Sequence, residues 1–175
     1  MSNLSDFLVG KGYGLKEVLT SSGSWNPATV GNPKKVYIRM IAGSGGNCEN
    51  AGGSNATDGG DTIWDTGAVV ATTTATGGDG ATTTSAGASI AGMLNSGVGI
   101  GNSSSCSTVN ILNSHYGTPN NPALSIISAW RGGYGELKEF EYIPNGTISY
   151  TIGAGGSEGQ TDYGDGNQGA IELYY

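Results

Sequence analysis

The side chains that could carry out chemistry are few in this chain, and their spacing does not build a catalytic centre. His115 is the single histidine, and no Gly-x-Ser-x-Gly stretch occurs in the strand-to-helix context that a serine nucleophile requires. Glu136, Glu139 and Glu141 cluster, and paired carboxylates can cleave glycosides. However, Glu139 and Glu141 fall on one face of an alternating strand beside a turn, which is typical of a solvated face. The sequence therefore predicts no catalytic residue and no enzyme.

Two short stretches are rich in oxygen ligands, at residues 58–61 and 162–167. Calcium binds such oxygens, but the EF-hand pattern with its closing glutamate is absent, so ordinary polar turns are favoured over a structural ion. No Gly-Lys-Ser/Thr ending marks a nucleotide-binding loop. Cys48 and Cys106 lack the short spacing of a zinc site, and we expect free thiols, with a disulfide as the alternative. The sequence predicts neither a metal nor a cofactor.

Binding is the chemistry that the sequence favours, through aromatic side chains in or beside glycine-rich loops. Tyr, Trp, Asn and Ser on such loops combine rigid aromatic contact with adaptable hydrogen bonding. Each tryptophan has core or subunit-interface packing as its alternative role. His115 and Tyr116, within residues 113–117, are the first that we expect to be exposed. The predicted ligand-binding residues are Trp64, His115, Tyr116, Trp130, Tyr134 and Tyr163.

Alternating segments predict the strands that must support these loops. In residues 35–41 the apolar side chains fall on one face, as in a half-buried strand. Residues 137–153 alternate on both sides of Pro144-Asn145-Gly146, which predicts a β-hairpin, and residues 171–175 predict a final strand. Between these strands, residues 42–133 consist largely of Gly, Ala, Ser, Thr and Asn. Such stretches form either mobile loops or closely packed extended segments.

Composition favours an ordered all-β domain over a disordered tail. The chain has 33 glycines among 175 residues, against a usual share of about 7%. Only 12% of residues are charged, and nine Tyr and three Trp can pack, whereas disorder usually comes with high charge and few aromatics. We expect an antiparallel, sandwich-like sheet structure with long glycine-rich loops or extended segments and no long helices. The hydrophobic share of 36% predicts a thin core, which a homotrimer would complete.

Charge and the N-terminal residues restrict the partners. The net charge is −7 with seven Lys and Arg, so the basic clusters that bind nucleic acid or anionic membranes are missing. No apolar run approaches the roughly 18 residues of a membrane-spanning helix, and the start lacks the features of a signal peptide. Residues 1–22 are predicted to be an arm and residues 23–175 a domain. The apolar side chains of the arm should dock on another protein or on the domain itself; these are Leu4, Phe7, Leu8 and Val9.

The order of these segments resembles the glycine-rich domain of bacteriophage tail fibres, tip adhesins and virion spikes. In that family a Trp-containing segment leads into one alternating strand and a glycine-rich loop, followed by a Gly/Thr block, a second strand block and a closing strand. The similar segments here are Trp25, residues 35–41, residues 43–46, residues 61–78, residues 132–136, residues 144–156 and residues 169–174.

The resemblance implies a virion protein exposed on the particle surface. The arm would attach the domain to other virion proteins, and the glycine-rich loops would contact a glycan or protein on the host cell. The alternative is a capsid decoration or tail protein that stabilises the particle without binding a receptor. Both interpretations predict a structural protein made in the bacterial cytoplasm, without nucleic-acid binding and without membrane insertion.

Overall fold

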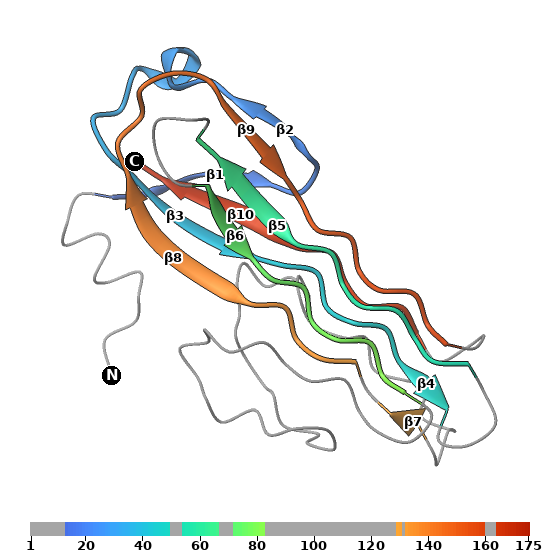
Figure 1. Ribbon diagram of the computed structural model, residues 1–175. Coiled ribbons are helices and arrows are strands. Elements are labelled where there is room, and N and C mark those ends of the chain that lie inside the picture. The colour runs from blue at the N-terminus through green and yellow to red at the C-terminus, as the bar shows by residue number, and fades with distance from the viewer. Residues whose placement is uncertain (1–12, 50–53, 67–71, 83–128, 131, 160–163) are drawn as a thin grey trace, which may run out of the picture.

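The computed structural model describes residues 13–49, 54–66, 72–82, 129–130, 132–159 and 164–175 (Figure 1). These residues form an all-β fold, as the sequence predicts, with two four-stranded antiparallel sheets and a two-stranded bridge. Their helical structure is one short 3-10 turn, Pro27–Val30, whose N-terminus is capped by the Asn26 side chain. No helix in the described part of the chain is long and apolar enough to cross a membrane.

The first sheet contains two of the strands that the sequence predicts. β3 (Val36–Ile41) matches the strand predicted at residues 35–41, and β10 (Ala170–Tyr174) matches the predicted final strand. The strand order is β1-β10-β3-β8, where β1 is Leu15–Leu19 and β8 is Leu137–Tyr142. Burial alternates along β3 up to its last two residues, which confirms a strand with one face in the core.

β1 lies within the segment predicted as the N-terminal arm. Its residues pair with β10, from Leu15 opposite Tyr174 to Leu19 opposite Ile171. Leu19 also packs against the hydrophobic core. This part of the predicted arm is therefore an edge strand of the sheet. The predicted docking side chains lie outside the described residues: Leu4, Phe7, Leu8 and Val9.

The second sheet shows that the predicted β-hairpin is wrong. Its order is β2-β9-β5-β6, with β2 at Gly23–Trp25, β9 at Ile148–Thr151, β5 at Thr62–Asp65 and β6 at Thr73–Ala75. β9 pairs with β2 and β5, whereas β8 pairs with β3, so residues 143–147 cross from one sheet to the other. Apolar and polar residues alternate along each strand because each strand buries one face against the opposite sheet. Two strands that pair within one sheet and two strands that belong to opposite sheets show the same alternation, so the sequence pattern does not distinguish these arrangements.

Aromatic rings fill the space between the two sheets. Trp64 on β5 is fully buried and stacks on Tyr150, with ring centroids 6.1 Å apart. Trp25 and Tyr142 contact the same indole at centroid distances of 6.0 and 5.9 Å. Burial of an apolar side chain contributes about 1.5–3 kcal/mol, so the described chain has a hydrophobic core of its own. Aliphatic residues of β3 and β10 complete that core: Val36, Ile38, Met40, Ile171 and Leu173.

Beyond the sheets, six extended segments lie side by side and form what we call the glycine bundle (Figure 1). Residues 42–47 are buried at its centre and hydrogen bond to all five other segments. Of the two structures predicted for the glycine-rich stretches, these segments adopt the closely packed one. The six segments are residues 42–47, 54–61, 76–82, 132–136, 153–159 and 164–169.

Hydrogen bonds from the central segment repeat every three residues. The N–H groups of residues 42 and 45 donate to one neighbouring segment, those of 43 and 46 to a second, and those of 44 and 47 to a third. The acceptors step by three as well, from Gly60 for Gly43 to Thr57 for Gly46, at 3.0 and 3.1 Å. A polyproline II helix has three residues per turn and no internal hydrogen bonds, so its polar groups point outward in three directions. The bundle has this repeat rather than the two-residue repeat of a sheet.

Glycine is required where the central segment meets its neighbours. A Cβ at Gly43 would lie 2.0 Å from the carbonyl oxygen of Ala154, and one at Gly45 would lie 2.0 Å from that of Asp79. These distances leave no room for a side chain, and only glycine lets two backbones approach so closely. The high glycine content is therefore explained in part by packing in the bundle.

Candidate functional site

Three chain connections leave the glycine bundle at the end away from the sheets. The segments 42–47, 76–82 and 153–159 run from the sheets to this end, and in each case the next segment returns (Figure 1). The connections at residues 48–53, 83–131 and 160–163 therefore all begin and end there. The arrangement brings the ends of three connections that are distant in sequence to one end of the bundle.

A short bridge joins two of these connections. β4 (Cys48–Glu49) pairs with β7 (Ala129–Trp130), with Cys48 opposite Trp130. Cys48 is buried and forms no disulfide with a described residue, and burial raises the pKa of its thiol. Cys106 lies outside the described residues.

Polar side chains fix the backbone where the connections leave the bundle. Buried Asn47 accepts a hydrogen bond from the N–H of Gly132 at Oδ1, at 3.0 Å. The N–H of Gly164 donates to Glu158 Oε2 at 2.5 Å, and the N–H of Glu158 donates to Asp165 Oδ1 at 2.8 Å. Specific side-chain contacts therefore hold at least one flank of each of the three connections, in addition to the bundle.

The oxygen-rich stretch at residues 58–61 also serves the bundle. Asp61 Oδ1 accepts from the N–H of Gly77 at 2.9 Å, and Asp58 Oδ1 accepts from the N–H of Gly80 at 2.7 Å. The three-residue spacing of the two carboxylates equals the spacing of the two donors. These aspartates supply acceptors to N–H groups that point away from the central segment. Among the described residues, no group of three or more His, Cys, Asp or Glu is arranged to hold a metal ion.

The predicted ligand-binding residues fall in different places, and the assignment of Trp64 is wrong. Trp64 is fully buried between the sheets, so its ring contacts core residues rather than a ligand. Trp130 lies in β7 at the end of the bundle, and half-buried Tyr134 lies in the segment 132–136. The remaining predicted residues lie outside the part of the chain that the structure describes: His115, Tyr116 and Tyr163.

A groove with a volume of about 340 Å³ lies on the sandwich, along β8. Residues 138–142 line one side, and Thr66 and Thr73 line the other. It forms there because β8 and β6 are the last strands of their sheets. Glu139 and Glu141 line it, although the sequence predicts them only as part of a solvated face.

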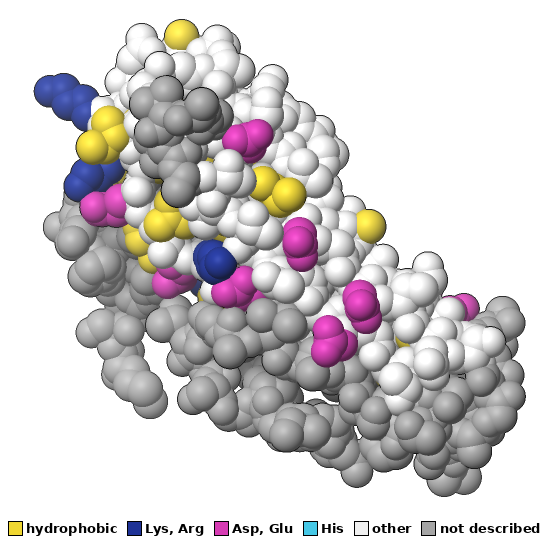
Figure 2. Space-filling model, in the orientation of Figure 1, with side chains coloured by type: hydrophobic (Ala, Val, Ile, Leu, Met, Phe, Trp, Pro, Cys, Tyr) yellow, Lys and Arg dark blue, Asp and Glu magenta, His cyan; other side chains and the backbone are white. Residues whose placement is uncertain are grey.

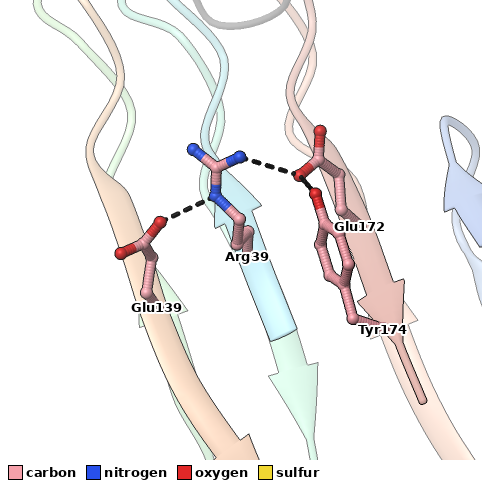
Figure 3. A network of polar contacts seen from close by, with 4 residues as sticks. All are labelled: Arg39, Glu139, Glu172 and Tyr174. Atoms are coloured by element: carbon pink, nitrogen blue, oxygen red, sulfur yellow. Dashed lines mark hydrogen bonds and ion pairs between the residues drawn. The ribbon is translucent and has the colours of Figure 1, made fainter. Parts of the chain in front are cut away.

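Figure 3 shows that Glu139 belongs to a charged network across three strands. Arg39 on β3 lies opposite Glu172 on β10 and opposite Glu139 on β8. Its Nε donates to Glu139 Oε1 at 2.7 Å, and its Nη1 donates to Glu172 Oε2 at 3.2 Å. The Tyr174 hydroxyl donates to the same Glu172 oxygen at 2.6 Å. The network fixes the orientation of Glu139. Burial raises the pKa of neighbouring Tyr37 to about 12, and the charge of Glu139 adds to that increase.

Burial changes the protonation behaviour of this network. The side chain of Glu172 is 1% exposed, and desolvation raises its pKa even though Tyr174 and Arg39 stabilise its charged form. Burial also raises the pKa of Tyr174 to about 12, and hydrogen bonding to Glu172 adds to that increase. A buried carboxylate with one cation shared between two acids is costly to ionise.

The other charged groups of the groove are held in the same way. Lys35 Nζ lies 2.8 Å from Glu141 Oε2, and the Tyr13 hydroxyl donates to Glu141 Oε1 at 3.3 Å. Lys138 Nζ donates to the Thr74 carbonyl oxygen at 2.5 Å and lies 3.4 Å from Glu136. Each charged side chain that lines the groove therefore has a defined partner.

The charge of the visible surface differs between the two ends of the molecule. In Figure 2 the Lys and Arg side chains lie over the sheets, whereas acidic side chains continue onto the bundle. No basic patch for a polyanion is visible on the described surface of this face.

Comparison with known proteins gives no relative for this chain. No family model, no curated protein and no solved structure matches it. The class of protein is therefore set by the fold alone: a β-sandwich from which a glycine bundle extends.

Proposed function

We propose that this chain is a non-enzymatic structural protein of a bacteriophage particle, of fibre or spike type, which presents the connections at the end of its glycine bundle to a host surface. The observation that carries this proposal is the bundle itself. Every N–H group of residues 42–47 bonds to a neighbouring backbone carbonyl, so the scaffold is held by the backbone. Recognition residues are commonly found on loops that a rigid scaffold positions.

The proposal extends to the assembly of the particle. Residues 1–12 would attach the chain to other virion proteins, and three copies would associate around a symmetry axis. The ligand would be a glycan or a protein of the host cell, contacted by residues of the connections. The acidic net charge of −7 favours a partner other than nucleic acid or an anionic membrane.

Competition with the intact particle tests this function. Purified protein, added to host cells before the phage, should lower the rate of phage adsorption. A matched variant in which a Gly/Ser linker replaces residues 83–128 should keep the thermal transition of the sandwich and lose this competition. If the intact chain does not compete, and particles that lack it adsorb normally but break more easily, the chain is a decoration protein instead.

A further inference from the structure

We propose that Asn145 and Gly146 form a site of spontaneous covalent modification, at which the asparagine converts to aspartate or isoaspartate. The two residues lie in the connection 143–147, which crosses from one sheet to the other at the end of the sandwich away from the bundle (Figure 1). A backbone nitrogen can attack the side-chain amide of the asparagine that precedes it, which is one reason why asparagine is thermolabile. Glycine favours the attack because it has no side chain to shield its nitrogen. The sequence contains an Asn-Gly pair at this position alone.

The reaction uses only groups of these two residues and water. The Gly146 nitrogen loses its proton to solvent and bonds to Cγ of Asn145. The bond between Cγ and Nδ2 then breaks, and the amide nitrogen takes a proton from solvent and leaves as ammonia. Water opens the cyclic imide at either carbonyl carbon, so the product is aspartate or isoaspartate. No group is oxidised or reduced, and both products carry a negative charge at neutral pH.

The local structure leaves the reacting nitrogen accessible. Asn145, Gly146 and Thr147 are all exposed. Within the described part of the chain, the Gly146 N–H has no hydrogen-bond acceptor. A Cβ at Gly146 would meet no atom within 4 Å. Solvent can therefore reach the N–H group, and the cyclic imide has room to form.

Three Asp-Gly pairs in the bundle show how structure prevents the same reaction. Aspartate followed by glycine forms the same imide, with water as the leaving group. In each pair of the bundle, however, the glycine N–H is hydrogen bonded at 2.7 or 2.8 Å. A Cβ on each of these glycines would lie 2.5 Å or less from a backbone oxygen. The reacting nitrogen is held by its neighbours, so the imide can form only after local opening. The pairs are Asp58-Gly59, Asp79-Gly80 and Asp165-Gly166.

The modification changes a contact between the connection and the core. Buried Tyr142, the last residue of β8, donates its hydroxyl to Asn145 Oδ1 at 3.1 Å. In isoaspartate the backbone runs through Cγ, which lengthens the connection by a methylene group and moves this acceptor. A buried hydroxyl that loses its acceptor destabilises the native state. The isoaspartate form should therefore melt at a lower temperature than the unchanged chain.

Peptide mass spectrometry of aged protein tests the site. The full chain would be incubated at mildly alkaline pH, both in native buffer and in urea. Isoaspartate would be located by peptide mass, by retention time and by reaction with an isoaspartate-specific methyltransferase. Native protein should accumulate the modification at Asn145. Asn55, which is exposed but followed by alanine, should stay unmodified in the same sample.

The ratio of the rates in urea and in native buffer separates the effect of structure from that of sequence. Folding should slow the reaction at Asn145 by less than about ten-fold, and at each Asp-Gly pair by at least about a hundred-fold, because only those pairs need local opening. Asn145→Gln should abolish the modification at this position, because the longer side chain forms a cyclic imide far more slowly. The proposal is overturned if Asn145 stays unmodified in the native chain, if folding protects it as strongly as it protects the Asp-Gly pairs, or if those pairs react first in native protein.

Discussion

A single methyl group in the centre of the glycine bundle should destabilise the whole domain. Gly43 donates to Gly60 and accepts from Gly78, at 3.0 and 2.9 Å. The Cβ of a Gly43→Ala variant would lie 2.0 Å from the Ala154 oxygen, whereas ordinary contact begins at 3.4 Å. The segments 42–47 and 153–159 must therefore separate by about the difference between these two distances.

The cost of this separation follows from the bonds that it breaks. Two hydrogen bonds join these segments, from Gly156 to Ser44 at 2.8 Å and from Gly159 to Asn47 at 2.9 Å. Losing both removes about 2 kcal/mol of net stability, and overpacking adds about 2 kcal/mol. A total of about 4 kcal/mol is a large part of the roughly 5–15 kcal/mol that stabilises a domain. In a chain of this size it lowers the melting temperature by roughly 8–16 °C.

Calorimetry and amide hydrogen exchange measure this effect. Gly23→Ala is the matched control, because a Cβ at Gly23 would meet only the far end of the Tyr150 side chain, at 3.0 Å. It should melt within a few degrees of the unchanged chain. In the unchanged chain the amides of residues 42–47 should exchange as slowly as those of β3. If Gly43→Ala melts like the control, or if those amides exchange freely, the packing of the bundle described above is incorrect.

Five further perturbations test other parts of the structure. Asp61→Ala should lower the free energy of unfolding in urea by about 1 kcal/mol, because a backbone donor loses its acceptor, and Asp61→Asn should restore it. Arg39→Ala should cost about 3–5 kcal/mol in the same assay, because buried Glu172 loses its cation, whereas Glu172→Gln should cost much less. Stability should rise as pH falls from neutral through the raised pKa of Glu172, because the native state binds this proton before the unfolded state does; Glu172→Gln should remove the effect. Stability should fall from pH 10 to about 12, because the pKa values of Tyr174 and Tyr37 are raised to about 12 and the unfolded state loses these protons first; a Tyr174→Phe variant should show a smaller loss. Deletion of residues 1–12 should leave the melting temperature unchanged and abolish incorporation into particles, as measured by mass spectrometry of purified virions.

Local patterns predict the strands of this fold but not their partners. The alternation at residues 35–41 identifies β3, and the alternation at residues 171–175 identifies β10, because each strand buries one face. The same reasoning predicts a hairpin at residues 137–153, where the two strands belong to different sheets. A turn with Pro144 and Gly146 reverses the chain in either case. Whether β8 and β9 pair with each other or join different sheets depends on their other partners. β8 pairs with β3, and β9 pairs with β2 and β5, and these partner strands are distant in the sequence.

The polar contacts of the charged network and of the glycine bundle depend on strand and segment register, which the sequence pattern predicts even less well than strand pairing. Arg39 meets two acids only because β10 and β8 place Glu172 and Glu139 directly opposite it. A spacing signal exists for the bundle, since Asp58 and Asp61 are three residues apart, as are the donors Gly77 and Gly80. This three-residue spacing is short and is also typical of a polar turn, which is the structure predicted from the sequence for residues 58–61. Trp64 illustrates the opposite error, because its glycine-rich surroundings suggested exposure although it is a core residue.

The two halves of the molecule are stabilised by different physical terms, and this difference bears on function. In the sandwich, stability comes from buried rings and aliphatic side chains, so its sequence is restricted by packing. In the bundle, stability comes from backbone hydrogen bonds repeated every three residues, so its sequence is restricted mainly to glycine and other small residues. The described flanks of the connections at the far end are held by the bundle and by the side chains of Asn47, Glu158 and Asp165. Under the proposed function, the residues that contact the host can therefore vary while the scaffold that presents them stays the same.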